Sequence, residues 1–243
     1  MTDRTTARQN LAEGAVGIAL LHLEAGDWEA AYASLDEAVT GGVSIGGGAS
    51  LYYGAPALAF VLAACDHPGL TRAQAVAAVG TATVTRRRLQ AAHRRIDQRQ
   101  RPATYAEFDL IRGLTGLGVA VRRIGDLPLF RDVLEYLVRL TEPLDGLPGW
   151  WCANGRDRNR PGRGHSNHGM AHGITGPLAL LALAVSDGVQ VDGQHAAITR
   201  ICQWLDHWER QSDGGAWWPE VITLDEVRRD DTRQPGPQRP SWC

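Results

Sequence analysis

The sequence predicts an all-α protein, and three observations point to that class. Apolar residues recur at helical spacing over most of the 243 residues, while alternating runs of β-branched residues are almost absent. The third observation is a recurring Gly-x-x-Gly step that leads directly into an apolar helix. It occurs at Gly14–Gly17, Gly113–Gly116 and Gly173–Gly176, and in weaker form at Gly54, where Ala57 replaces the second glycine. Four copies of one helix-start signal indicate a repeat architecture.

The predicted helices are of two alternating kinds. Those that follow the glycine steps are nearly uncharged and are expected to be buried on most of their surface. Those between them carry an arginine and glutamate face. In chain order we expect helices at 11–23, from Asp27 onward, and at 51–64, 72–79, 83–96, 105–124, 128–140, 176–185 and 194–210. The alternation predicts a closed ring of helical hairpins, in which the glycines allow helix ends to pack closely.

Two longer segments, 143–167 and 212–240, break the helical pattern and are predicted to be irregular. Loops of this length in a compact domain are usually functional or disordered. Their tryptophans argue against simple disorder. We therefore expect these segments to wall a cleft, with Trp150, Trp151, Trp217 and Trp218 as candidate walls for an apolar peptide, although tryptophans in a core are the commoner case.

Composition excludes several classes of function. The formal net charge is −2, so no basic surface for nucleic acid and no polybasic membrane anchor is expected. The longest apolar run, 178–185, is too short to span a bilayer, and the N-terminus lacks the apolar core of a secretory signal. The cysteines lie far apart, without a Cys-x-x-Cys pair. These features predict a cytoplasmic protein with free thiols.

Four motifs in order along the chain resemble the repeated signatures of the lanthionine synthetase C family, the LanC-like cyclases. They are Leu11-Ala12-Glu13-Gly14-Ala15-Val16-Gly17, the segment 107–116, Gly169-Met170-Ala171-His172-Gly173-Ile174-Thr175-Gly176-Pro177, and Arg239-Pro240-Ser241-Trp242-Cys243. The resemblance implies an α/α toroid, a double ring of helices, with residues 1–243 as one LanC-like domain. In the family the last motif continues into a Tyr-Gly segment and a later Cys-His-Gly motif. We therefore expect the toroid to be incomplete at the C-terminus, as in a fragment, a truncated product, or the product of a natural but defective gene.

The resemblance also implies a set of site residues. His172 is similar to the family's active-site histidine, a general acid or base, and Asp109 to an acidic residue of the same pocket. Arg239 resembles an arginine that steadies an enolate oxygen, and Cys243 the first ligand of a catalytic Zn²⁺. One thiolate cannot hold zinc, because a catalytic site takes three protein ligands. The metal site is therefore not expected to be complete in this chain.

Each of these residues also has a purely structural interpretation. His172 could be a capping or packing group at a helix start, Asp109 could accept hydrogen bonds from amides before the next helix, and Arg239 could lie in a solvated loop. His165, His168 and His172 form an H-x-x-H-x-x-x-H run that could be taken for a metal site. The intervening glycines disfavour a helix there, which argues against that interpretation.

The leading functional hypothesis is a cyclase that adds peptide cysteine thiols to dehydroalanine or dehydrobutyrine, giving thioether rings in a lanthipeptide precursor. Its implied partners are the dehydrated precursor peptide and, as further candidates, a dehydratase and a transporter. One alternative is a catalytically inactive LanC-like protein that binds a peptide or a partner enzyme. Another is a different α/α-toroid enzyme, acting on carbohydrates or isoprenoids. That enzyme would need paired carboxylates or an aspartate-rich motif, and the nearest candidates, Asp230 and Asp231, lack a helical setting.

Overall fold

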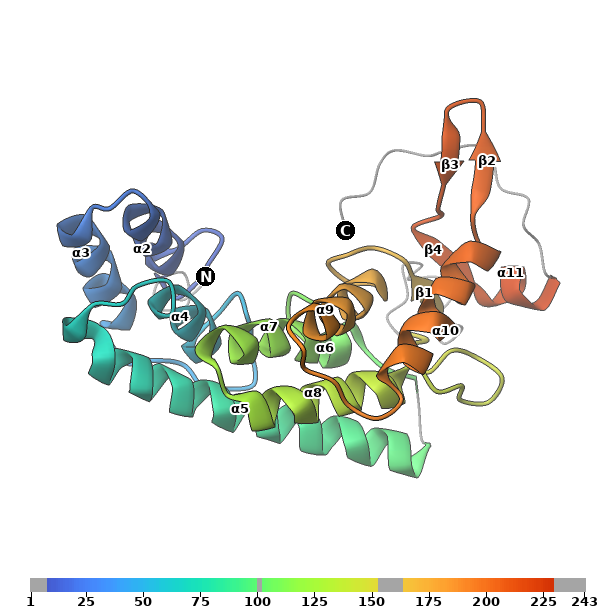
Figure 1. Ribbon diagram of the computed structural model, residues 1–243, viewed down its shortest axis with the longest axis horizontal. Coiled ribbons are helices and arrows are strands. Elements are labelled where there is room, and N and C mark those ends of the chain that lie inside the picture. Colours follow the sequence, from blue (N-terminus) through green and yellow to red (C-terminus); the bar gives the residue numbers. More distant parts are fainter. Residues whose placement is uncertain (1–7, 100–101, 153–163, 230–243) are drawn as a thin grey trace. The chain divides into compact units, whose positions relative to one another are not determined.

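A computed structural model of the chain describes residues 8–99, 102–152 and 164–229 (Figure 1). Helices dominate this part of the chain, and its strands are short, so the all-α class is confirmed. The chain divides into two compact units, one made of Met1–Leu89 and Gly116–Phe130, the other of Gln90–Thr115 and Arg131–Cys243. None of the described helices is long and apolar enough to cross a membrane.

Three helices lie wholly within the described part of the first unit, which also includes most of α5 (Thr71–Gln98) and α7 (Leu114–Ile124) and the start of α8 (Leu127–Leu140). α2 (Ala15–Glu24) and α3 (Trp28–Val39) pack against each other (Figure 1). The Asp27 carboxylate caps α3 by accepting a hydrogen bond of 3.1 Å from the Ala30 amide. α4 (Ala55–Leu62) contacts α2 and is buried along almost its whole length, as its uncharged sequence predicts. A 3₁₀ turn, η1 (Pro68–Leu70), then leads into α5 (Thr71–Gln98).

The second unit carries the elements that later position the candidate site. α6 (Tyr105–Phe108) is a single turn, and α7 (Leu114–Ile124) and α8 (Leu127–Leu140) each belong partly to both units. The remaining elements are β1 (His165–Asn167), α9 (Thr175–Ser186), α10 (Gln194–His207), β2 (Arg210–Ser212), β3 (Gly215–Trp217), β4 (Val221–Thr223) and α11 (Leu224–Arg229). β1 pairs antiparallel with β4, and β2 with β3.

A buried ion pair fixes α6 in the second unit. Arg95, near the end of α5, donates from Nε and Nη2 to the two carboxylate oxygens of Glu107 at 2.7 and 2.8 Å. The Tyr136 hydroxyl, from α8, donates to the same carboxylate at 2.9 Å. Burial opposes the charge of Arg95, but the hydrogen bond and charge of Glu107, together with Tyr136, outweigh it and raise the pKa of the guanidinium. Three helices are thus tied together next to the turn that carries Asp109.

The structure differs from the predicted elements in three places. The helices expected at 72–79 and 83–96 form one continuous helix, α5. A Cβ at Gly80 would lie 2.8 Å from the Ala55 Cβ, so the glycine serves close packing and does not end the helix. The hydroxyls of Thr81, Thr83 and Thr85 donate back to carbonyls four residues earlier, so they do not disrupt the helix either.

The other two differences lie in the second unit. The helix expected at 105–124 is interrupted at 109–113, because the Asp109 side chain bonds the amides that a continuous helix would bond by its own carbonyls. The irregular segments contain regular elements: β1 closes the first, and β3, β4 and α11 occupy part of the second. Short strands of three residues leave little alternation for a sequence pattern to register.

Candidate active site

His172 and Asp109, far apart in the sequence, form a hydrogen-bonded pair in the second unit. The Nδ1 atom of His172 lies 2.6 Å from Oδ2 of Asp109. Asp109 is fully buried, whereas the His172 side chain is one-third exposed (33%). A carboxylate can only accept, so Nδ1 carries the hydrogen and Nε2 is the nitrogen left for proton exchange. Nε2 of His172 has no hydrogen-bond partner within residues 8–99, 102–152 and 164–229.

The second oxygen of Asp109 has a structural task. Oδ1 accepts hydrogen bonds from the amides of Arg112 and Gly113, at 2.6 and 2.7 Å, just before α7 begins. This is the capping arrangement that the sequence offers as the structural interpretation of Asp109. The two interpretations are compatible, because each uses a different oxygen. The two amides therefore hold one oxygen of the carboxylate in place, while the other oxygen orients His172.

The two loops that carry the pair are also joined through the backbone. The amide of Leu110, next to Asp109, donates to the carbonyl of Ala171, next to His172, at 3.0 Å. Gly113 and Gly173 allow each of these loops to fold closely on itself. A Cβ would lie 2.2 Å from the Asp109 nitrogen at Gly113, and 2.4 Å from the Asn167 carbonyl oxygen at Gly173. The glycines of the repeated step therefore serve to fold the site loops tightly.

Tyr105 is a site residue that the sequence analysis missed. Its ring stacks on the His172 imidazole with centroids 5.2 Å apart and planes at 29°. Its hydroxyl forms a hydrogen bond with Nε2 of His165 and accepts another, of 3.3 Å, from the side-chain amide of Asn167. Tyr105 stands four residues before Asp109, one turn earlier on α6, which is the only signal that could have marked it. The tyrosine and aspartate together confine the His172 ring from its face and its edge.

His168 has a separate set of contacts. Its Nε2 accepts a hydrogen bond of 2.9 Å from the Trp204 indole on α10. Burial lowers the pKa of His168 to about 4, with the Pro219 carbonyl opposing and the Arg210 charge adding to the decrease. The hydrogen-bond partners differ: Tyr105 for His165, Trp204 for His168 and Asp109 for His172. Within the described residues, these three histidines are not grouped so as to hold a metal ion.

A protein-family model described as "Lanthionine synthetase C-like protein" matches residues 5–243. The chain belongs to this family. Among solved structures it is similar to nisin cyclase, with a TM-score of 0.78 and 20% sequence identity, over 99% of this chain and 63% of that one. The chain thus spans less than two thirds of the cyclase's length. A search of curated proteins finds no match.

For this lanthionine synthetase C-like chain, the predicted fold is confirmed: it is the α/α-toroid fold of nisin cyclase. Of the four predicted site residues, the structure places His172 and Asp109 in contact. Arg239 and Cys243 lie outside the described residues. Within the part of the chain that is described, no three His, Cys, Asp or Glu side chains are grouped to hold a metal ion. The described residues alone therefore form no zinc site.

The tryptophans predicted to wall a cleft differ in their exposure to solvent. Trp150 and Trp151 are 3% exposed, and the Trp150 indole donates to the Ser166 hydroxyl at 2.9 Å, so they belong to the core of the LanC-like second unit. Trp218 is exposed, and its indole donates to the Leu205 carbonyl. The expectation that these residues line one cleft is therefore wrong for the first pair, which lies in the core.

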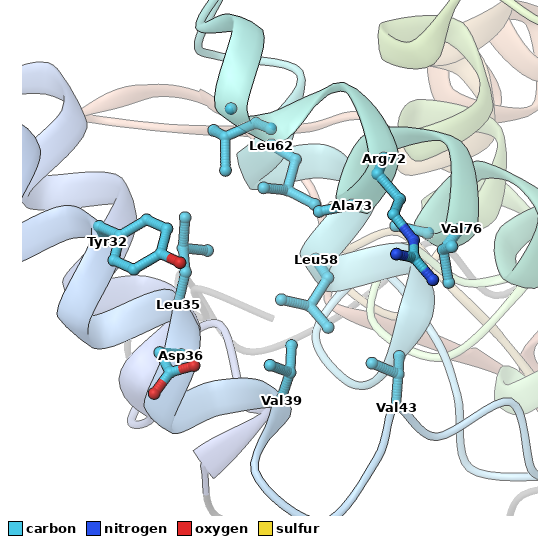
Figure 2. Close-up of a pocket in the computed structure, with 13 residues that line it drawn as sticks. Tyr32, Leu35, Asp36, Val39, Val43, Leu58, Leu62, Arg72, Ala73 and Val76 are labelled. Carbon is cyan, nitrogen blue, oxygen red and sulfur yellow. The ribbon is translucent and has the colours of Figure 1, made fainter.

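The first unit contains a separate cavity of about 390 Å³ between α3, α4 and the start of α5 (Figure 2). Aliphatic side chains such as Leu35, Leu58 and Val76 form most of its surface, and Asp36 and Arg72 also line it. The cavity holds neither His172 nor Asp109.

Proposed function

We propose that this chain is the part of a lanthipeptide cyclase that carries its proton-transfer residues. The reaction is the addition of a peptide cysteine thiol to a dehydroalanine or dehydrobutyrine of a dehydrated precursor peptide. The observation that carries the proposal is the His172–Asp109 pair at 2.6 Å, in a chain that belongs to the lanthionine synthetase C-like family. Residues 1–243 are proposed to act as one LanC-like domain.

The reaction needs one proton to move from sulfur to carbon. A carbon–sulfur bond forms at the β-carbon, the double-bond electrons shift to an enolate, and the α-carbon takes up a proton. His172 can perform this transfer through Nε2, because Asp109 already occupies Nδ1. It accepts the thiol proton and then donates a proton to the enolate. Asp109 and Tyr105 hold the ring in one orientation for both steps.

The roles proposed for Arg239 and Cys243 rest on the family resemblance alone. A guanidinium at Arg239 would stabilise the enolate oxygen as negative charge develops. Cys243 would be one ligand of a Zn²⁺ whose Cys-His partners the family pattern places after it. We further propose a cytoplasmic protein that acts on a dehydrated precursor peptide, with a dehydratase and a transporter as candidate partners.

The test is cyclisation of a dehydrated precursor by His172→Ala, compared with His195→Ala, an exposed histidine on α10. Ring formation does not change the peptide mass, so the free thiols left are counted by alkylation and mass spectrometry. His172→Ala is expected to lower the rate about 10²–10⁴-fold, as loss of a general acid–base group does. His195→Ala should cyclise like the wild type.

Metal content separates proton transfer from zinc binding in the same experiment. In a protein extended through the family's Cys-His-Gly motif, His172→Ala should leave the zinc content unchanged, whereas Cys243→Ala should abolish it. An extended wild-type protein that binds zinc and the precursor but leaves every thiol free would contradict the cyclase proposal. That result would favour the alternative, a catalytically inactive LanC-like protein that binds a peptide or a partner enzyme.

A further inference from the structure

Arg210, the first residue of β2, carries a buried guanidinium with incomplete hydrogen bonding. The residue is 8% exposed. Its Nη1 donates to the adjacent Glu209 carbonyl at 2.9 Å. Its Nε and Nη2 are buried and have no hydrogen-bond partner anywhere in the described chain. A buried charge without a partner is costly, so this guanidinium calls for an acceptor that is not among the described residues.

Two tryptophans beside Arg210 have the same deficit. The guanidinium carbon lies 5.3 Å from the centre of the Trp208 ring, and Trp217 is the cross-strand partner of Arg210 in the β2–β3 pair. The indole N–H groups of Trp208 and Trp217 are both buried and find no acceptor in the described segments. Indole and guanidinium groups can only donate. Arg210, Trp208 and Trp217 therefore present four buried nitrogen donors that have no acceptor among the described residues.

Among the described side chains, Nδ1 of His168 is the one other buried polar atom without a hydrogen-bond partner. The indoles of Trp150, Trp204 and Trp218 donate to Ser166, His168 and the Leu205 carbonyl, respectively. The carboxylate of the adjacent Glu209 accepts from Gln211. Buried polar groups in proteins are nearly always satisfied, so a cluster of orphaned donors marks a binding site for an acceptor.

The geometry of the guanidinium indicates the chemistry of that acceptor. Nε and Nη2 form the side edge of an arginine, which matches the two oxygens of a carboxylate. Arg95 uses the same two atoms to bind Glu107, at 2.7 and 2.8 Å. We propose that Arg210, flanked by Trp208 and Trp217, binds a carboxylate through this edge. The proposal is independent of the cyclase reaction, because none of these residues takes part in the transfer through His172.

The carboxylate has two possible sources, a bound acidic peptide or the chain's own residues Asp230 and Asp231. The probe for the first is N-acetyl-glutamic acid α-amide, with N-acetyl-glutamine amide as the uncharged control, both added at constant ionic strength. The ¹⁵N NMR signals of the Arg210 Nε–H and of the two indole N–H groups report binding. We expect saturable shifts with the acid and none with the amide.

Variants tie the response to the guanidinium. Arg210→Gln removes a buried charge without a described partner, so the fold should be retained while binding weakens at least about tenfold. Arg210→Lys keeps the charge but loses the two-pronged edge, and should also bind less tightly than the wild type. Arg229→Gln, an exposed arginine on α11, is the matched control and should bind like the wild type.

The double variant Asp230→Asn/Asp231→Asn distinguishes the two sources. A response of the wild-type chain assigns the site to an external carboxylate. If only the double variant shows shifts with the acid, the site in the wild type is occupied by the chain's own aspartates. Both results support the proposal. The proposal is wrong if neither protein responds, or if Arg210→Gln responds as strongly as the protein that it was made from.

Discussion

Replacing Asp109 by asparagine separates the two tasks of its carboxylate. The amide oxygen of the introduced asparagine can still accept from Arg112 and Gly113, because that contact uses only Oδ1. The other atom becomes an NH₂ group, which donates where Oδ2 accepted. His172 must then present an unprotonated Nδ1 to it and carry its hydrogen on Nε2. The variant therefore keeps the cap but reverses the histidine tautomer.

The expected magnitudes follow from these contacts. A hydrogen bond to a charged group contributes about 1.5–3 kcal/mol and a neutral one about 0.5–1.5, so two weakened bonds lower the free energy of unfolding by about 2 kcal/mol. For a chain of this size that corresponds to a Tm decrease of about 4–8 °C. Asp109→Ala leaves both amides unpaired and should cost about 2–6 kcal/mol. Cyclisation by Asp109→Asn should fall about 10²–10⁴-fold, since Nε2 can no longer accept the thiol proton.

Two assays check the reasoning independently. Ring ¹⁵N chemical shifts of His172 report the tautomer without substrate, and alkylation of residual thiols reports the rate. We expect the hydrogen on Nδ1 in the wild type and on Nε2 in Asp109→Asn. If the asparagine variant kept the wild-type tautomer, or cyclised within about threefold of the wild-type rate, Asp109 would not be orienting His172 as argued.

Two further predictions concern stability. The folded-state pKa of His168 is about 4, below its ordinary value of 6.5, so the unfolded chain takes up the proton first as pH falls. As pH falls from 6.5 to about 4, the free energy of unfolding should decrease by about 3 kcal/mol, and above pH 6.5 this contribution should be fully present. Urea unfolding at a series of pH values should show this dependence in the wild type but not in His168→Gln. Glu107→Gln leaves the buried Arg95 without its counter-charge and should lower the unfolding free energy by about 3–5 kcal/mol, whereas Tyr136→Phe should cost about 1 kcal/mol by the same measurement.

Patterns of local origin could be predicted from the sequence. The uncharged helix after Gly54 is buried, and the helix start at Asp27 has its cap, because both depend on neighbouring residues. The resemblance to a known family supplied His172 and Asp109 as candidates, and spacing alone supplied the capping role of Asp109. Each of these features requires only a few consecutive residues or a motif.

Features that depend on distant packing could not be predicted. In the sequence, Gly80 lies between two predicted helices. In the structure it lies inside α5, where a side chain would collide with the Cβ of Ala55. Tyr105 becomes a site residue because a loop 67 positions further along the chain brings the His172 ring onto its face. The orphaned N–H groups of Arg210 have no sequence signature, since burial and partners emerge only in the folded chain.

The shared carboxylate of Asp109 makes part of the backbone a reporter on the site. The amides of Arg112 and Gly113 donate to the same side chain that holds His172, so their exchange with solvent slows only while that carboxylate is in place. A loss of protection at these two amides would reveal a displaced aspartate in a protein that is otherwise folded. The integrity of the His172–Asp109 pair can therefore be followed in the absence of any peptide.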